Sequence, residues 1–180
     1  MRSYIFGVLM IVMGGSVLFG QTTSAKHKWI GTWTLNKHKT TFDSQFQRPG
    51  IDLNAFNQTL KLDETGGKIK VIAETTYSAD TPPRVEEQSL SLDGAETSIG
   101  GLNFSFRRID DTSFDIVGKI NTKDANGISV NHFVVSRDGK TLTETKTQTA
   151  REAVPQGTDQ TKGAIVRSST SVFVFDKALR

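Results

Sequence analysis

The sequence contains no cysteine and only three histidines, and both scarcities narrow what the protein can be. Without cysteine there can be no disulfide and no lipid-modified cysteine at an export signal, so stability must come from packing and sheet hydrogen bonds. His27, His38 and His132 lack the spacing of metal ligands, and neither a cysteine nucleophile nor a Gly-x-Ser-x-Gly motif is present. We therefore predict no catalytic residue, no metal site and no cofactor.

Dense runs of one charge are missing as well. The 22 lysines and arginines nearly balance the 19 aspartates and glutamates, for a formal net charge of +3. No basic run is dense enough to follow a phosphate backbone, so nucleic acid is not an expected partner.

The one long apolar stretch lies at the start of the chain. Arg2 precedes an uncharged run over residues 3–19, and polar residues follow at 21–25. This run is shorter than the ~20 apolar residues that a spanning helix needs, which favours a cleaved secretory signal over residues 1–25 rather than a retained membrane anchor. We expect residues 26–180 to form one domain without stable membrane insertion. Export without disulfides suits a bacterial protein that is periplasmic or secreted.

Beyond residue 25 the pattern is one of short β-branched and aromatic runs separated by turn residues, with no convincing helix. Strands spaced every ~8 to 12 residues are typical of a sandwich or barrel. The predicted strands are 27–36, 58–63, 68–77, 84–92, 97–99, 102–109, 113–120, 128–136, 141–149 and 165–177. Gly66 and Gly67 supply the positive φ of a tight hairpin, whereas Asp124 to Gly127 and Arg137 to Lys140 are further hairpin signals.

Closure of the sheet is the argument for a barrel. A meander of so many hairpins leaves its first and last strands as open edges unless those two strands pair with each other. The sequence thus predicts an all-β, antiparallel up-and-down barrel of about eight to ten strands. Residues 37–56, interrupted by Pro49 and Gly50, are expected to form an ordered loop over one end of the barrel, and residues 150–163 a long surface loop.

Several motifs resemble those of one protein superfamily. Gly31-Thr32-Trp33 matches the Gly-x-Trp that opens the first strand of lipocalins. Together with Lys39 to Phe42, Arg108 to Asp111 and Val134 to Thr141, it is similar to lipocalin-like exported proteins of bacteria within the calycin superfamily. The Thr-Asp-Tyr motif of true lipocalins is absent. Fatty-acid-binding proteins are also calycins, but Pro49 and Gly50 make their two-helix lid unexpected here.

The resemblance implies a barrel with an apolar interior and with Trp33 packed at its closed end. A basic side chain of the last strand, Arg167 or Lys177, would cover that tryptophan, and Arg167 is the proposed cover. A barrel of about eight strands either fills with side chains or holds one small ligand.

Alternation along the strands indicates which residues face inward. The proposed inner faces are Leu102, Phe104, Phe106 and Arg108, then Phe114, Ile116, Gly118 and Ile120, then Ile128, Val130, His132 and Val134. On the next strand Thr141, Thr143, Thr145 and Thr147 share one face, and Leu142, Glu144, Lys146 and Gln148 share the other. The ligand-binding residues predicted from these faces are Phe104, Phe106, Arg108, Phe114, Ile116, Val130 and His132.

Among these residues, Arg108 and His132 carry the polar chemistry. An inward Arg108 could form a two-point contact with a ligand carboxylate, whereas an arginine at the strand end would only cover apolar surface. His132 is a ligand contact or, more simply, a hydrogen-bonded histidine.

Three functions remain open from the sequence. The first is a barrel that binds a small hydrophobic or amphipathic molecule in its interior. The second is a non-enzymatic interaction module with a solid core, marked by an exposed apolar patch. The third is a barrel-type enzyme, which would need a carboxylate or histidine of strongly perturbed pKa inside the pocket.

Overall fold

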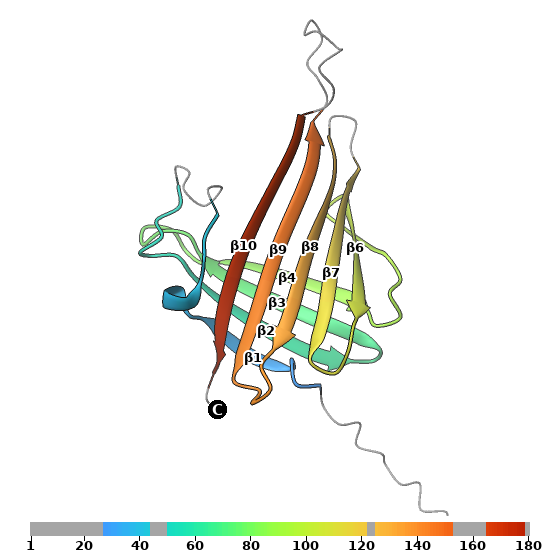
Figure 1. Ribbon diagram of the computed structural model, residues 1–180, viewed down its shortest axis with the longest axis horizontal. Helices are drawn as coiled ribbons and strands as arrows, with labels where there is room; N and C mark the ends of the chain where they lie inside the picture. The colour runs from blue at the N-terminus through green and yellow to red at the C-terminus, as the bar shows by residue number, and fades with distance from the viewer. Residues whose placement is uncertain (1–26, 44–49, 122–124, 153–164, 179–180) are drawn as a thin grey trace, which may run out of the picture.

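The computed structural model describes residues 27–43, 50–121, 125–152 and 165–178. These residues form ten strands and one short 3₁₀-helical turn (Figure 1). The strands are β1 (Gly31–Leu35), β2 (Asn57–Thr65), β3 (Lys68–Thr76), β4 (Arg84–Ser91), β5 (Thr97–Ile99), β6 (Leu102–Arg108), β7 (Ser113–Asn121), β8 (Ala125–Val135), β9 (Thr141–Glu152) and β10 (Ile165–Lys177), and the turn is η1 (Lys37–Lys39). In the described part of the chain no helix is long and apolar enough to cross a membrane.

All ten strands belong to one antiparallel sheet in the order β4-β3-β2-β1-β10-β9-β8-β7-β6-β5. The first and last strands pair as closure requires, with Trp33 opposite Lys177 and Leu35 opposite Phe175. Every other neighbour in the sheet is also a neighbour in the chain. The all-β, up-and-down barrel predicted from the sequence is therefore confirmed.

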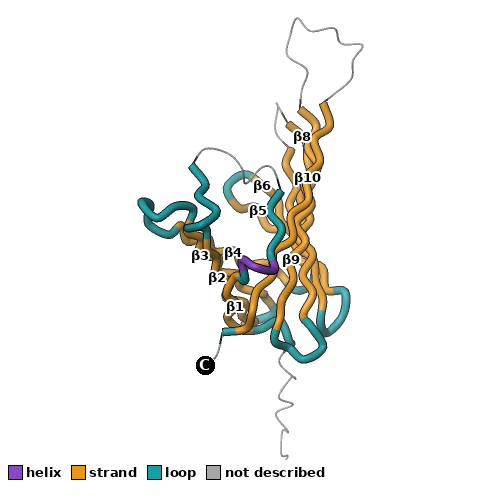
Figure 2. Tube along the Cα trace, turned by 60° about the vertical axis from the view of Figure 1, so that its left-hand side comes forward, coloured by secondary structure: helices purple, strands orange, loops and turns teal. Residues whose placement is uncertain are grey.

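The sheet curls so that its two halves face each other. Strands β6 to β10 form the front of the molecule in Figure 1, and β1 to β4 cross behind them. The ends of the sheet are β4 and β5, which are not hydrogen-bonded to each other, so a seam separates them. At one end of the barrel β8, β9 and β10 run on past the other strands (Figure 2).

Glycines with positive φ form the turns at the ends of several strands. Gly66 and Gly67 have φ of 59° and 73° in the β2–β3 turn, as the sequence predicts, and Gly139 has φ of 71° in the β8–β9 turn. The predicted hairpin between β7 and β8 is present, but Asn126 and Gly127 are not in its turn. Asn126 and Gly127 lie in β8, where they pair with Asn121 and Ile120 of β7.

The closed end of the barrel is built on two tryptophans. Trp29 and Trp33 are fully buried, and Nε1 of Trp33 donates a hydrogen bond to the Trp29 carbonyl oxygen at 2.8 Å. Nζ of Lys177 lies 4.8 Å from the centre of the Trp33 ring, within cation–π range. Lys177 is thus the basic cover of Trp33. Arg167, the cover proposed from the sequence, lies opposite Ala150 near the other end of β10, so Lys177 and not Arg167 takes this role.

The segment between β1 and β2 packs on the core through aromatic side chains. The ring of Phe42 lies 5.3 Å from that of buried Phe56 and 5.9 Å from that of Phe173, measured between centroids. Residues 44–49 of this segment lie outside the described residues, as do most of the predicted loop 150–163 and the predicted signal peptide. Residues 150–152, the start of that loop, instead continue β9.

Candidate functional site

A cavity of about 580 Å³ lies between the two halves of the barrel, adjoining the aromatic core. On β7, β8 and β9 its lining positions continue the alternation of that core: Ile116 and Gly118 follow buried Phe114, Asn131 and Ser129 adjoin Phe133, and Lys146 follows Glu144. The other walls come from β2, β3, β4 and the β5–β6 hairpin. The lining residues are Gln58, Leu60, Val71, Ala73, Arg84, Glu86, Glu87, Gln88, Ile99, Gly100, Leu102, Phe104, Ile116, Gly118, Ser129, Asn131, Phe133, Glu144, Lys146 and Gln148.

The apolar part of the cavity has two facing walls. Leu60, Val71 and Ala73 of β2 and β3 form one, and Phe104 and Ile116 are in the other. Gly118 fixes the position of the Phe104 ring, because a Cβ at Gly118 would lie 2.9 Å from a ring carbon of Phe104. The missing side chain lets the phenyl ring pack directly on the backbone of β7.

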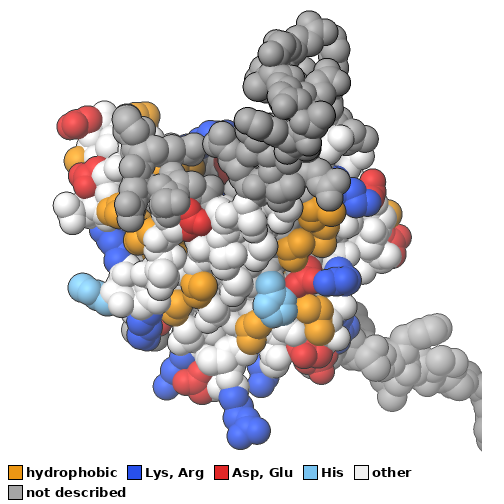
Figure 3. Space-filling view, turned by 45° about the horizontal axis from the view of Figure 1, so that its top comes forward, with side chains coloured by type: hydrophobic (Ala, Val, Ile, Leu, Met, Phe, Trp, Pro, Cys, Tyr) orange, Lys and Arg blue, Asp and Glu red, His pale blue; other side chains and the backbone are white. Residues whose placement is uncertain are grey.

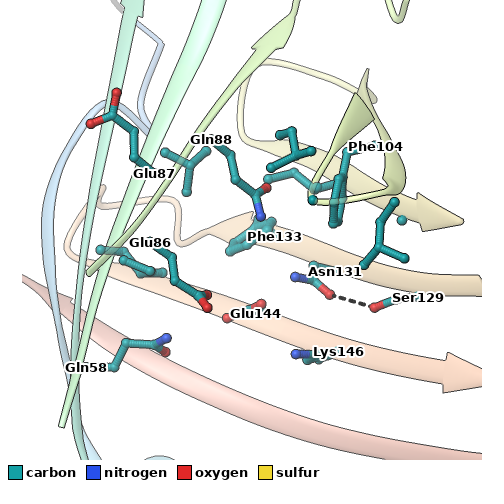
Figure 4. Close-up of a pocket in the computed structure, with 18 of the residues that line it drawn as sticks. Gln58, Glu86, Glu87, Gln88, Phe104, Ser129, Asn131, Phe133, Glu144 and Lys146 are labelled. Atoms are coloured by element: carbon teal, nitrogen blue, oxygen red, sulfur yellow. Dashed lines mark hydrogen bonds between the residues drawn. The ribbon is translucent and has the colours of Figure 1, made fainter. Parts of the chain in front are cut away.

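Polar side chains form the rest of the lining, and most of them already have partners. Nε2 of Gln58 donates to the Thr75 hydroxyl at 3.1 Å. Arg84 pairs with Glu86 at 2.8 Å on β4. Glu87 points away from the cavity (Figure 4) and pairs with Lys70.

Glu144 differs from these polar residues. Its side chain is only 7% exposed, and in the sheet it lies directly between Phe133 of β8 and Phe173 of β10. No hydrogen bond or ion pair joins its carboxyl group to another described residue. Burial raises the pKa of Glu144 to about 7, and the positive charge of Lys146 offsets part of that rise.

The seven residues predicted to bind ligand occupy four different places. Phe104 and Ile116 line the cavity. Phe106 and Phe114 are buried in the core beside it, where their rings lie 5.3 Å apart between centroids.

Arg108 belongs to the closed end rather than to the cavity. Its guanidinium carbon lies 6.0 Å from the centre of the Trp29 ring, and its side chain forms an ion pair with Asp111. Although it shares a face with Phe104 and Phe106, it is the last residue of β6 and projects past the barrel interior. The predicted contact between Arg108 and a ligand carboxylate therefore has no place in this cavity.

The prediction that Val130 and His132 face the interior is wrong. Phe133 of β8 is buried and lines the cavity, so the alternate positions Ile128, Val130, His132 and Val134 face outward. Ile128 is 51% exposed and Val134 38% exposed. The inner face of β8 combines buried Phe133 and Val135 with polar Ser129 and Asn131, so the more continuous apolar face of this strand is the outer one.

On the outer face His132 forms part of a charged cluster. Asp115, whose side chain is 3% exposed, lies opposite it on β7, and its carboxylate oxygen is 2.6 Å from Nδ1 of His132. Nε of Arg107 donates to the same carboxylate at 3.0 Å. In the view of Figure 3, hydrophobic side chains on the surface are interspersed with charged ones. Of the two roles considered for His132, a ligand contact or a hydrogen-bonded histidine, the structure supports the second.

The sequence did not lead us to select Glu144 or any residue of the β2–β4 wall as part of the site. The available signal was that Glu144 shares its face with apolar Leu142. The described residues contain no group of three or more histidines, aspartates and glutamates arranged to hold a metal ion.

Comparison with known proteins places the fold. No family model matches the sequence, and no curated protein matches it. Seventeen chains of solved structures match, among them a Schistosoma mansoni fatty acid binding protein in complex with arachidonic acid, with a TM-score of 0.53 and 13% identity over 84% of this chain and 97% of that one. At this identity the likeness shows the fold alone. The fold is an antiparallel β-barrel like that of this fatty acid binding protein.

Two further structures are less similar. A fatty acid transporter named REP1-NXSQ has a TM-score of 0.47 and 14% identity, covering 84% of this chain and 96% of its own. A biotin binding protein from chicken has a TM-score of 0.32 and 16% identity, covering 83% of this chain and 95% of its own. These two scores are too low to carry an argument. All three proteins are described as binding or transport proteins.

Proposed function

We propose that this protein binds a small amphipathic molecule inside its barrel. The observation that carries the proposal is the cavity of about 580 Å³, which lies within the range of small-molecule sites and joins an apolar wall to a few polar groups. A solid interaction module would have filled this space with side chains. The proposal also places the protein outside the cytoplasm as a lipocalin-like exported bacterial protein, on the strength of the apolar run at residues 3–19 and the Gly31-Thr32-Trp33 motif.

The direct test is native mass spectrometry of the protein purified from its own host. We expect a co-purifying small molecule that organic extraction releases. Protein that carries no such molecule, and that also fails to bind the neutral apolar dye Nile red, would contradict the proposal.

A cavity-filling substitution tests the location of binding. Ala73 lines the cavity, so we expect Ala73→Phe to weaken Nile red binding by at least about tenfold, because the new ring occupies the space of the ligand. The matched control is Ile72→Phe, which adds bulk on the opposite face of the same strand. Fluorescence titration of both variants checks the prediction, and equal effects would place the dye elsewhere.

One observation favours a second candidate, a barrel-type enzyme. Glu144 is a cavity carboxyl group with a pKa raised to about 7, which is suited to general acid–base catalysis. The cavity lining contains no histidine, and its one serine, Ser129, lies opposite Gln148 rather than Glu144 and donates to Asn131 at 3.4 Å. Incubating the recovered molecule with fresh protein separates the candidates: an unchanged mass favours binding, and a changed mass favours catalysis.

A further inference from the structure

The Glu144 carboxyl group is the one strongly buried polar group of the cavity lining without a partner among the described residues. Its strand neighbours on either side, Phe133 and Phe173, are themselves buried and offer no hydrogen-bond donor from their side chains. Cross-strand neighbours lie ~5 Å apart between Cβ atoms, so these two rings shield the carboxyl group from both sides. Figure 4 shows the carboxyl oxygens at the cavity, so the cavity is the direction from which a partner can come.

The charged groups around the cavity do not supply that partner. From its own strand, Lys146 acts on Glu144 only at a distance and forms no ion pair with it. From β4, Arg84 and Glu86 pair with each other, and Glu87 pairs with Lys70. The remaining walls present only uncharged side chains, namely Gln58, Leu60, Val71, Ala73, Ile99, Leu102, Phe104, Ile116, Ser129, Asn131 and Phe133.

An apolar ligand in the cavity would make the ionised form of Glu144 less favourable. In the empty barrel the carboxyl group can be hydrated from the cavity, but an apolar ligand would displace that water. An ionised carboxylate without water or a counter-charge is strongly unfavourable in an apolar site. A ligand with a carboxylate at this position would add repulsion between like charges. A ligand with a protonated amine would instead form a charge-assisted hydrogen bond.

We infer that the cavity selects an amphipathic molecule whose polar end is a protonated amine, held by the Glu144 carboxylate, with its apolar body against Phe104, Ile116 and Phe133. The inference rests on the proposed function and names its ligand class. Because burial holds the pKa of Glu144 at about 7, binding of such a cation near neutral pH drives a proton off this carboxyl group.

Three probes that differ only at the polar end test the selection: dodecylamine, dodecanol and dodecanoic acid. Each probe is titrated against Nile red bound to the wild-type protein at pH 7.5, below the concentration at which the probe forms micelles. We expect dodecylamine to bind at least about tenfold more tightly than dodecanol, and dodecanoate to bind most weakly. Equal affinities, or a preference for dodecanoate, would overturn the inference and leave the proposed function intact. Failure of Nile red and of all three probes to bind would reject the proposed function itself.

Substitution of Glu144 tests whether its carboxyl group causes the preference for dodecylamine. We expect Glu144→Gln to abolish the preference for dodecylamine over dodecanol while leaving the affinity for dodecanol within about twofold. The control Glu74→Gln makes the same charge change on β3, on the face turned away from the cavity, and should retain the preference. A preference that survives in Glu144→Gln would refute the assignment.

A second measurement needs no variant. Calorimetry of dodecylamine binding to the wild-type protein at pH 7, in two buffers of different ionisation enthalpy, counts the protons released. We expect release of a fraction of a proton per molecule with dodecylamine and none with dodecanol. Absence of release with dodecylamine would also overturn the inference, whether or not Glu144→Gln folds.

Discussion

Gly31 shows how one residue links the Gly-x-Trp motif to the closed end of the barrel. Its φ of +144° lies in a region that residues with a side chain rarely adopt. A Cβ at this position would lie 3.2 Å from Cε of Lys177, the residue whose ammonium group covers Trp33. Glycine is therefore needed both for the backbone conformation and for the passage of the lysine stem over the indole.

We expect Gly31→Ala to destabilise the protein by about 1–3 kcal/mol through backbone strain, and somewhat more through displacement of Lys177. Gly139→Ala is the matched control, because Gly139 also has a positive φ but has open space where the Cβ would go. Urea unfolding of both variants, repeated in a Lys177→Ala background, separates strain from crowding. If the excess cost of Gly31→Ala over Gly139→Ala persisted without Lys177, crowding would not be its cause.

At the scale of the strand, β8 shows that alternation of residue types does not always identify the inner face. Strands β6 and β7 alternate apolar with polar residues, and their inner faces were predicted correctly at Phe104, Phe106, Phe114 and Ile116. In β8 the outer face carries Ile128, Val130 and Val134, whereas the inner face carries polar Ser129 and Asn131 beside Phe133, so the period of two exists but the apolar residues mark the wrong face. The register with β7, which places His132 opposite Asp115 on the outer face, resolves what the sequence of β8 alone could not.

A pair of neighbouring substitutions checks the orientation of β8. Phe133→Ala should lower the free energy of unfolding by about 3–5 kcal/mol, because it removes a buried ring that stacks on Phe114. Val134→Thr, one residue further, should change it by no more than about 0.5 kcal/mol because Val134 faces solvent. Equilibrium unfolding in urea measures both, and similar losses would show that β8 is turned the other way.

At the scale of the whole molecule, the pairing of the first strand with the last could be predicted from the sequence, but the seam and the cavity could not. The number of hairpins left two edges that had to pair, and β1 does pair with β10. The cavity depends on distances between β4, β7 and β9, which are far apart in the chain, and on a seam between β4 and β5. For that reason Glu144, an ordinary glutamate in a threonine-rich strand of the sequence, is revealed as a buried group only by the fold.

The burial of Glu144 also shapes the pH dependence of the whole barrel. Its pKa rises from 4.5 to about 7 on folding, so between these values the folded protein binds more protons than the unfolded chain. Stability then falls as pH rises through this window, by at most about 3 kcal/mol at ~1.4 kcal/mol per unit of pKa. Below pH 4.5 the group is neutral in both states and this contribution to stability is fully present.

We expect the empty wild-type protein to lose stability from pH 4.5 to pH 7 relative to Glu144→Gln, whose amide does not titrate. Four aspartates, Asp93, Asp110, Asp138 and Asp176, have lowered pKa values and act in the opposite direction, but only at pH near or below 3.8, outside this window. The measurement is urea unfolding of both proteins at intervals of half a pH unit, with the difference between the two curves isolating Glu144. Parallel curves across the window would mean that the Glu144 carboxyl group is as well solvated in the folded barrel as in the unfolded chain.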